Sequence, residues 1–147
     1  MTPTQDPEVR LRYHDTLSLV RDYYLKALNT GRFDYLDTLL TEDFADHETM
    51  IGIPPTRDGL KTKYGLLRAG FSDFAFAVED LVSNRDRVAV RVTVSGTHDG
   101  VFMGRAPTGR RFDVASVGIF RVADGRLAEH WGVFDQLGML GQLGAMG

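Results

Sequence analysis

The spacing of apolar side chains changes once along the chain, from helical steps of three and four to strict alternation. Between residues 8 and 29 the apolar positions follow one face of an amphipathic helix: Val9, Tyr13, Leu17, Val20, Tyr24 and Leu28. We expect Thr30-Gly31 to end this helix, because glycine readily adopts the left-handed conformation of a helix C-terminus. Residues 33–40 predict a second, shorter helix, and residues 44–47 a short strand.

A third helix is predicted after the proline-containing segment 51–55, which can be neither a central strand nor a helix interior. Thr56 can cap this helix, and Asp58 falls in its first turn, where an acid is favourable. Its expected buried face carries Leu60, Tyr64, Leu67 and Phe71.

The second half of the chain alternates with period two, which is typical of half-buried strands. Residues 74–82 and 87–98 predict one hairpin, and residues 112–122 and 126–134 a second. Residues 136–145 predict a short terminal helix. Helices followed by an antiparallel meander define an α+β fold, and we expect one domain over residues 1–147. A curved sheet closed by helices forms a cone whose mouth suits a small molecule.

Composition narrows the function classes. The chain has 147 residues, a net charge of −3 and no cysteine. No basic block indicates nucleic-acid binding, and no apolar run of about 18 residues predicts a membrane span. Without a signal-like segment or cysteine we expect a cytoplasmic protein. Phosphate-loop, dinucleotide-binding and zincin motifs do not occur, and the four histidines are far apart in sequence.

The candidate chemistry gathers in residues 125–136, GRLAEHWGVFDQ, which hold the single tryptophan, Trp131. Asp135 can act as a general base in an apolar pocket, where desolvation raises the pKa of a carboxyl group. It can equally cap the terminal helix, and the two roles are compatible. Trp131 has the parity of Asp135, so we expect both to point inward and His130 to point outward.

Further candidates lie at the ends of strands and in loops. His47 can donate to a substrate oxygen or carry a proton, whereas its neighbour Asp46 is expected in solvent or a turn. His98 lies either at the pocket rim or in a role that fixes the next loop. We expect substrate contacts from the apolar side chains of Phe102, Met103 and Phe120.

Several short motifs, in order, resemble those of the SnoaL-like polyketide cyclases, a branch of the NTF2-like superfamily. They are DFADH at 43–47, the hairpin 80–91, GTHDGVFMG at 96–104, PTGR at 107–110, FRVADGRLAEHW at 120–131, and Asp135 with the closing QLG at 142–144. The resemblance covers about residues 10–145. One difference is Gly132, because members often carry a polar residue after the tryptophan.

The resemblance implies a cone-shaped NTF2-like fold and ring closure on a bulky apolar polyketide-type substrate, without cofactor or metal. Asp135 matches the carboxylate that removes a proton, and His47 matches a polar pocket contact. Epoxide hydrolysis, dehydration or a pericyclic cyclisation in the same pocket remain alternatives, as does a binding module without catalysis. NTF2-like proteins often dimerise through the sheet, so a homo-oligomer (dimer or tetramer) is expected, with the polar stripe around Arg91 either solvated or at that interface.

Overall fold

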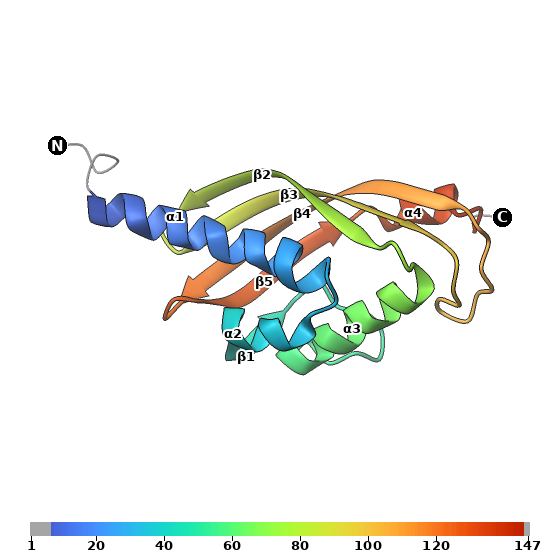
Figure 1. The fold of residues 1–147 in the computed structure, drawn as a ribbon, viewed down its shortest axis with the longest axis horizontal. Helices are drawn as coiled ribbons and strands as arrows, with labels where there is room; N and C mark the ends of the chain where they lie inside the picture. Colours follow the sequence, from blue (N-terminus) through green and yellow to red (C-terminus); the bar gives the residue numbers. More distant parts are fainter. Residues whose placement is uncertain (1–6, 146–147) are drawn as a thin grey trace.

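The protein is an α+β structure in which helices cover one face of a curved sheet (Figure 1). The computed structural model describes residues 7–145, with side chains from residue 15 onward. The helices are α1 (Pro7–Asp22), α2 (Leu36–Leu39), α3 (Arg57–Gly70) and α4 (Gln136–Gln142), with a π-helical continuation of α1 at Tyr23–Leu28 and a 3-10 turn at Phe33–Tyr35. The strands are β1 (Leu40–Asp46), β2 (Ala75–Asn84), β3 (Arg87–Thr97), β4 (Arg111–Ala123) and β5 (Arg126–Phe134). No helix in this described part is long and apolar enough to cross a membrane.

The five strands form one sheet in the order β1-β5-β4-β3-β2. The meander from β2 to β5 is antiparallel throughout, as the alternating pattern predicts. The short strand expected at residues 44–47, whose partner the sequence left open, is part of β1, which runs parallel to β5. Parallel neighbours need a long connection, and here α3 and the meander supply it. This pairing brings the chain around residue 46 beside the end of β5, where the site lies.

Local signals in the sequence correspond to observed turns and caps. The Thr56 hydroxyl accepts a hydrogen bond from the Gly59 backbone N–H at 3.0 Å and caps α3. Gly31, with a φ of 74°, ends the first helical segment. The expected second helix is divided, since a 3-10 turn and the single turn of α2 precede Leu40, which begins β1.

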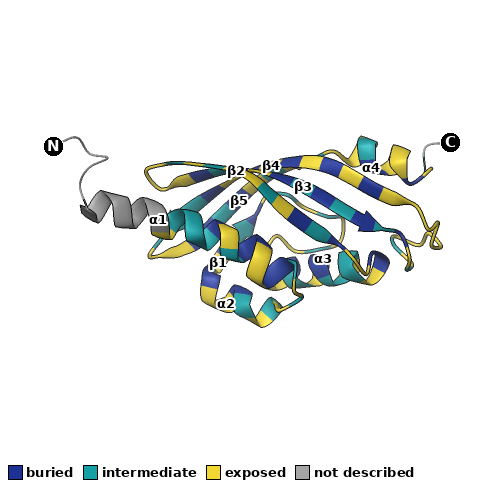
Figure 2. Ribbon diagram, turned by 45° about the horizontal axis from the view of Figure 1, so that its top comes forward, coloured by how far each residue is buried: buried dark blue, intermediate teal, exposed yellow. Residues whose placement is uncertain are grey.

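The concave face of the sheet and the helices enclose the core. Strands alternate between buried and exposed residues, as the striping in Figure 2 shows. Phe120 on β4 is fully buried, with its ring centroid 5.0 Å from that of Tyr23 and 4.5 Å from that of His130. The contact joins the first helical segment to the middle of the sheet.

The expected orientation of β5 is wrong. His130 is 3% exposed and faces the helices, whereas Trp131 is 36% exposed and lies on the outer face. Register explains the reversal, because His130 pairs with buried Phe120 and Trp131 pairs with exposed Ile119. Hydrophobicity favours tryptophan as the inward residue, but His130 has a buried acidic partner 84 residues away that the local sequence does not reveal.

Replacing Phe120 by alanine should destabilise the protein by about 3–5 kcal/mol, because it leaves a cavity in the core. Ile119→Ala, one residue away on the outer face, should cost well under half of that. Chemical denaturation of both variants measures the difference. Equal losses of stability would contradict the orientation of β4, in which Phe120 points into the core and Ile119 points to the outer face.

Candidate active site

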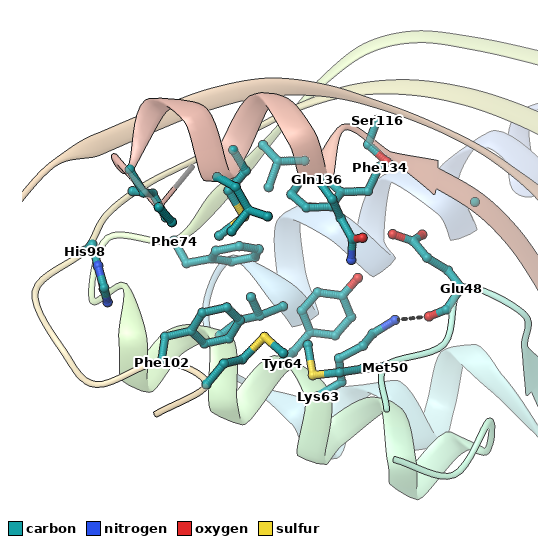
Figure 3. Close-up of a pocket in the computed structure, with 18 of the residues that line it drawn as sticks. Glu48, Met50, Lys63, Tyr64, Phe74, His98, Phe102, Ser116, Phe134 and Gln136 are labelled. Carbon is teal, nitrogen blue, oxygen red and sulfur yellow. Dashed lines mark hydrogen bonds between the residues drawn. The ribbon is translucent and has the colours of Figure 1, made fainter. Parts of the chain in front are cut away.

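A cavity of about 890 Å³ lies between the concave face of the sheet, α3, α4 and the loop 98–110. Most of its wall is apolar, and the apolar side chains that line it include Leu67, Phe74, Phe76, Phe102, Phe134 and Met139. Figure 3 shows Glu48 and Lys63 toward one side of this cavity and His98 at the other. Such a volume is in the range of small-molecule sites.

A buried group of charged side chains closes one end of the cavity. The Lys63 ammonium donates to Asp46 Oδ2 at 2.7 Å and to the Glu48 carbonyl oxygen at 2.8 Å. His130 Nδ1 lies 3.0 Å from Asp46 Oδ1. Asp46, Lys63 and His130 are each less than a tenth exposed. Helix α3 supplies the lysine, β5 the histidine and β1 the aspartate, so these contacts join three elements.

Asp46 is the ionised member of this group. Burial raises the pKa of the Asp46 carboxyl, but the hydrogen bond from His130 and the Lys63 ammonium lower it more, so the net pKa is below the usual value. The carboxylate therefore accepts the His130 Nδ1–H and a Lys63 N–H together. His130 Nε2, on the opposite side of the ring, is left to face Glu48.

Glu48 differs from Asp46 although both lie in the same charged group. Burial raises the pKa of the Glu48 carboxyl, and the opposing effects of His130 and Lys63 do not cancel this increase. Glu48 Oε2 lies 3.8 Å from His130 Nε2, too far for a short hydrogen bond, and the side chain is 26% exposed. It lines the cavity. The Glu48 carboxyl is thus a partly desolvated group whose proton affinity is increased.

Gly132 makes room for this carboxylate. A Cβ atom at position 132 would lie 2.1 Å from Glu48 Oε2 and 2.9 Å from His130 Cε1. Any side chain at 132 would therefore displace the Glu48 carboxyl group. The glycine that departs from the expected pattern and the acid at position 48 fit each other in space.

Neutral and cationic donors line the same cavity as the Glu48 carboxylate. Burial raises the pKa values of Tyr24 and Tyr64 well above the usual value, so their hydroxyls stay protonated. Both tyrosines line the cavity, as does Lys63. An ammonium has three N–H donors, and the two named contacts leave one for a ligand. This end of the cavity can hold a negatively charged oxygen next to a base.

Asp135, the base expected from the sequence, lies outside the cavity lining. It is exposed, and its carboxylate accepts the Gly138 backbone N–H at 2.8 Å, which caps α4. Of the two roles weighed for this residue, the structure shows the cap. With Trp131 it shares the outer face of the sheet, as the common parity requires.

His47 lies at the edge of the cavity, where it is 44% exposed in its side chain. Its Nε2 is 2.8 Å from Glu129 Oε2, and its ring stacks on Trp131 at 5.1 Å between centroids. Arg87 covers the same indole at 5.2 Å. Trp131 itself is not among the lining residues. His47 therefore belongs to a surface stack that reaches the mouth of the cavity.

The remaining expected substrate contacts divide between cavity and core. His98, Phe102 and Met103 line the cavity, while Phe120 is packed in the core beneath it. The loop expected at the rim does reach the cavity, with Gly70 against the Phe102 side chain.

Sequence reasoning missed the charged group of Asp46, Glu48, Lys63 and His130. Asp46, expected in solvent or a turn, is 3% exposed. One signal was present, because Lys63 falls on the apolar face of α3, three residues after Leu60 and four before Leu67. No three His, Asp or Glu side chains in the described part of the chain are arranged to hold a metal ion.

Comparisons with known proteins agree with this architecture. The family described as SnoaL-like polyketide cyclase matches residues 18–143. A curated relative, the nogalonic acid methyl ester cyclase of Streptomyces nogalater, is 33% identical over 122 residues, covering 82% of this chain and 91% of that protein.

Two solved structures share the fold over most of this chain. TsrD from Streptomyces laurentii has a TM-score of 0.81 and 29% identity, covering 90% of this chain and 97% of its own. Wild-type IdmH from Streptomyces antibioticus has a TM-score of 0.78 and 34% identity, covering 88% and 98%. The motifs, the fold and these matches together show that this chain belongs to the SnoaL-like polyketide cyclase family.

Proposed function

We propose that this protein closes a ring of a bulky, mostly apolar polyketide-type substrate by an intramolecular aldol-type reaction, with Glu48 as the base. The observation that carries the proposal is the partly desolvated Glu48 carboxyl group at the polar end of an apolar cavity of about 890 Å³. Relatives named for ring closure on nogalonic and aklanonic acid methyl esters support the substrate class.

In the first step Glu48 removes a proton from a carbon made acidic by an adjacent carbonyl group. The electron pair moves onto that carbonyl oxygen, and the free N–H of Lys63 and the Tyr64 hydroxyl can donate to the resulting enolate. The enolate carbon then bonds to a second carbonyl carbon of the same molecule. The oxygen of this second carbonyl group takes up the proton held by Glu48 and becomes a hydroxyl group, so no atom is gained or lost.

Among the acids near the cavity, Glu48 fits the role of base best. A general base works best when its pKa approaches the working pH, and burial raises the pKa of Glu48. The pKa of Asp46 is lowered by partners that also occupy both of its oxygens. Asp135 is exposed and outside the cavity lining. His130, held by Asp46, can keep the Glu48 side chain in place.

The alternatives from the sequence fit the site less well. Epoxide hydrolysis needs a water held between a base and a further free acid or arginine. Asp46 is engaged by Lys63 and His130, and Arg105, which also lines the cavity, is an exposed residue of the loop 98–110. A binding module without catalysis would have its cavity filled by side chains, whereas about 890 Å³ is open here. A cytoplasmic location stays a prediction.

Glu48→Gln should lower kcat/KM about 100-fold or more, because the amide cannot accept the proton. Nogalonic acid methyl ester is the probe, and ring closure is followed by absorbance and mass. Asp135→Asn is the matched control. Asparagine also caps helices, so this variant should keep α4 and stay within a few-fold of wild type. Full activity in E48Q with a large loss in D135N would overturn the assignment.

We also propose that two copies associate through the outer face of the sheet. Exposed apolar side chains pair across β4 and β5 there, Val117 with Val133 and Ile119 with Trp131. Two ion pairs flank them, Arg91 with Asp80 and Arg121 with Glu129, so positive and negative groups lie on both sides of the apolar patch. A twofold-related copy can therefore match its own surface, which an isologous dimer requires.

Val133→Glu should convert this dimer to a monomer in light scattering coupled to size exclusion, because it places a charge in the apolar patch. Leu66→Glu, at an exposed apolar position on α3, should leave the dimer intact. A wild-type protein that is monomeric at high concentration would contradict the interface.

A further inference from the structure

We propose that His98 donates a hydrogen bond from its Nε2–H to a neutral carbonyl oxygen of the substrate, at the end of the cavity opposite Glu48. The inference deepens the proposed function, on which it rests, by fixing the orientation and chemical class of the bound molecule. It stands on the tautomer, the burial and the position of this one ring.

Contacts with Thr108 fix the tautomer of His98. The Thr108 backbone N–H lies 3.3 Å from His98 Nδ1 and can only donate, so Nδ1 carries a lone pair. The Thr108 hydroxyl also lies 3.1 Å from Nδ1 and accepts the Arg110 backbone N–H, which leaves its own hydrogen free to point at the ring. A neutral imidazole with an unprotonated Nδ1 must carry its hydrogen on Nε2.

The Nε2–H of His98 has no protein partner within the described residues. Its nitrogen is fully buried, and the residue is 2% exposed. A buried donor without a partner costs about 1–3 kcal/mol, so an acceptor supplied by the ligand is a favourable match. His98 lines the cavity, and Figure 3 places it across the cavity from Glu48.

The His98 ring is held rigidly before any ligand binds. The His98 backbone N–H donates to the Arg110 carbonyl oxygen at 2.9 Å, and the Gly109 N–H donates to the His98 carbonyl oxygen at 2.8 Å. The Phe71 ring packs against the imidazole at 5.3 Å between centroids. A donor fixed in this way loses little conformational entropy when it binds an acceptor.

The surroundings of His98 favour a neutral acceptor. The Phe71 ring packs against His98, and the Phe102 ring packs against Phe71, so a carboxylate placed among these apolar rings would be an unpaired buried charge. Arg105 also lines the cavity, but it is exposed and solvated. A ketone, quinone or ester carbonyl oxygen meets the Nε2–H without this cost. The distance along the substrate from this carbonyl oxygen to the carbon that Glu48 deprotonates would then determine which ring closes.

A pair of substitutions separates the donor from the fold. The amide of His98→Asn reaches about as far as Nδ1 and can keep the Thr108 contact, but it places no donor at the Nε2 position. The amide of His98→Gln reaches about as far as Nε2 and restores a donor there. Both variants are made in the Glu48→Gln background, so that binding is measured without turnover.

H98N should weaken binding of nogalonic acid methyl ester at least tenfold in calorimetry, and H98Q should recover most of that loss. The free acid should bind wild type more weakly than the methyl ester. In the enzyme with Glu48 intact, H98N should raise KM with a much smaller change in kcat. Equal dissociation constants for H98N and the parent would overturn the inference, whether or not Glu48 proves to be the base.

Nitrogen NMR of the free protein gives a test that needs no ligand. The His98 ring should show a protonated Nε2 and an unprotonated Nδ1. A proton on Nδ1 would overturn the inference, and failure of wild type to bind nogalonic acid methyl ester would contradict the carbonyl-bearing ligand class.

Discussion

The buried contacts of Asp46 are the constraint on which the site depends. Its two oxygens bind Lys63 of α3 and His130 of β5, so one carboxylate ties the β1 edge of the sheet to the helix that walls the cavity. Removing one partner from a buried ion pair typically costs about 3–5 kcal/mol, because the other charge stays buried. The parallel pairing of β1 with β5 brings these groups together.

The same contacts divide the two acids into different roles. Asp46 takes the short contacts to Lys63 and His130 and remains ionised, with a lowered pKa. Glu48 is left with a longer approach to His130 Nε2 at 3.8 Å, and burial raises its pKa. Two carboxyl groups with pKa values moved in opposite directions are typical of acid–base sites. Gly132 completes the arrangement by leaving the space that the Glu48 carboxyl occupies.

The sequence predicted most of the fold because its signals are local. Helical spacing, the Thr56 cap and the alternation of valines in β3 each depend on neighbours along the chain. The family resemblance added the overall architecture. The parallel pairing of β1 with β5 was not predicted, because pairing between residues 40–46 and 127–130 has no signature in the local sequence.

The site was predicted only in part, for a related reason. His98, Phe102 and Met103 were expected at the cavity and do line it, because a glycine-rich loop with apolar side chains is itself a local signal. Asp135 was expected there from the resemblance, but it caps α4 outside the lining. His130 and Asp46 are polar, so the local sequence predicts that both are exposed to solvent. Their hydrogen bond to each other, across 84 residues of sequence, makes it favourable to bury them.

The central claim is that the desolvated Glu48 carboxylate is the base, and its titration tests this most directly. Carbon NMR of the Glu48 carboxyl should give a pKa above the usual value for glutamate, and kcat/KM should fall as the pH drops through that same pKa. Lys63→Met should raise the Glu48 pKa and move the fall of kcat/KM to higher pH, because it removes a cation that lowers this pKa. Lys61 binds Asp37 on the surface, so Lys61→Met should change neither the pKa nor the pH profile. A Glu48 pKa at the usual value for glutamate would contradict the account. So would a K63M variant in which the Glu48 pKa shifts but the pH at which kcat/KM falls does not.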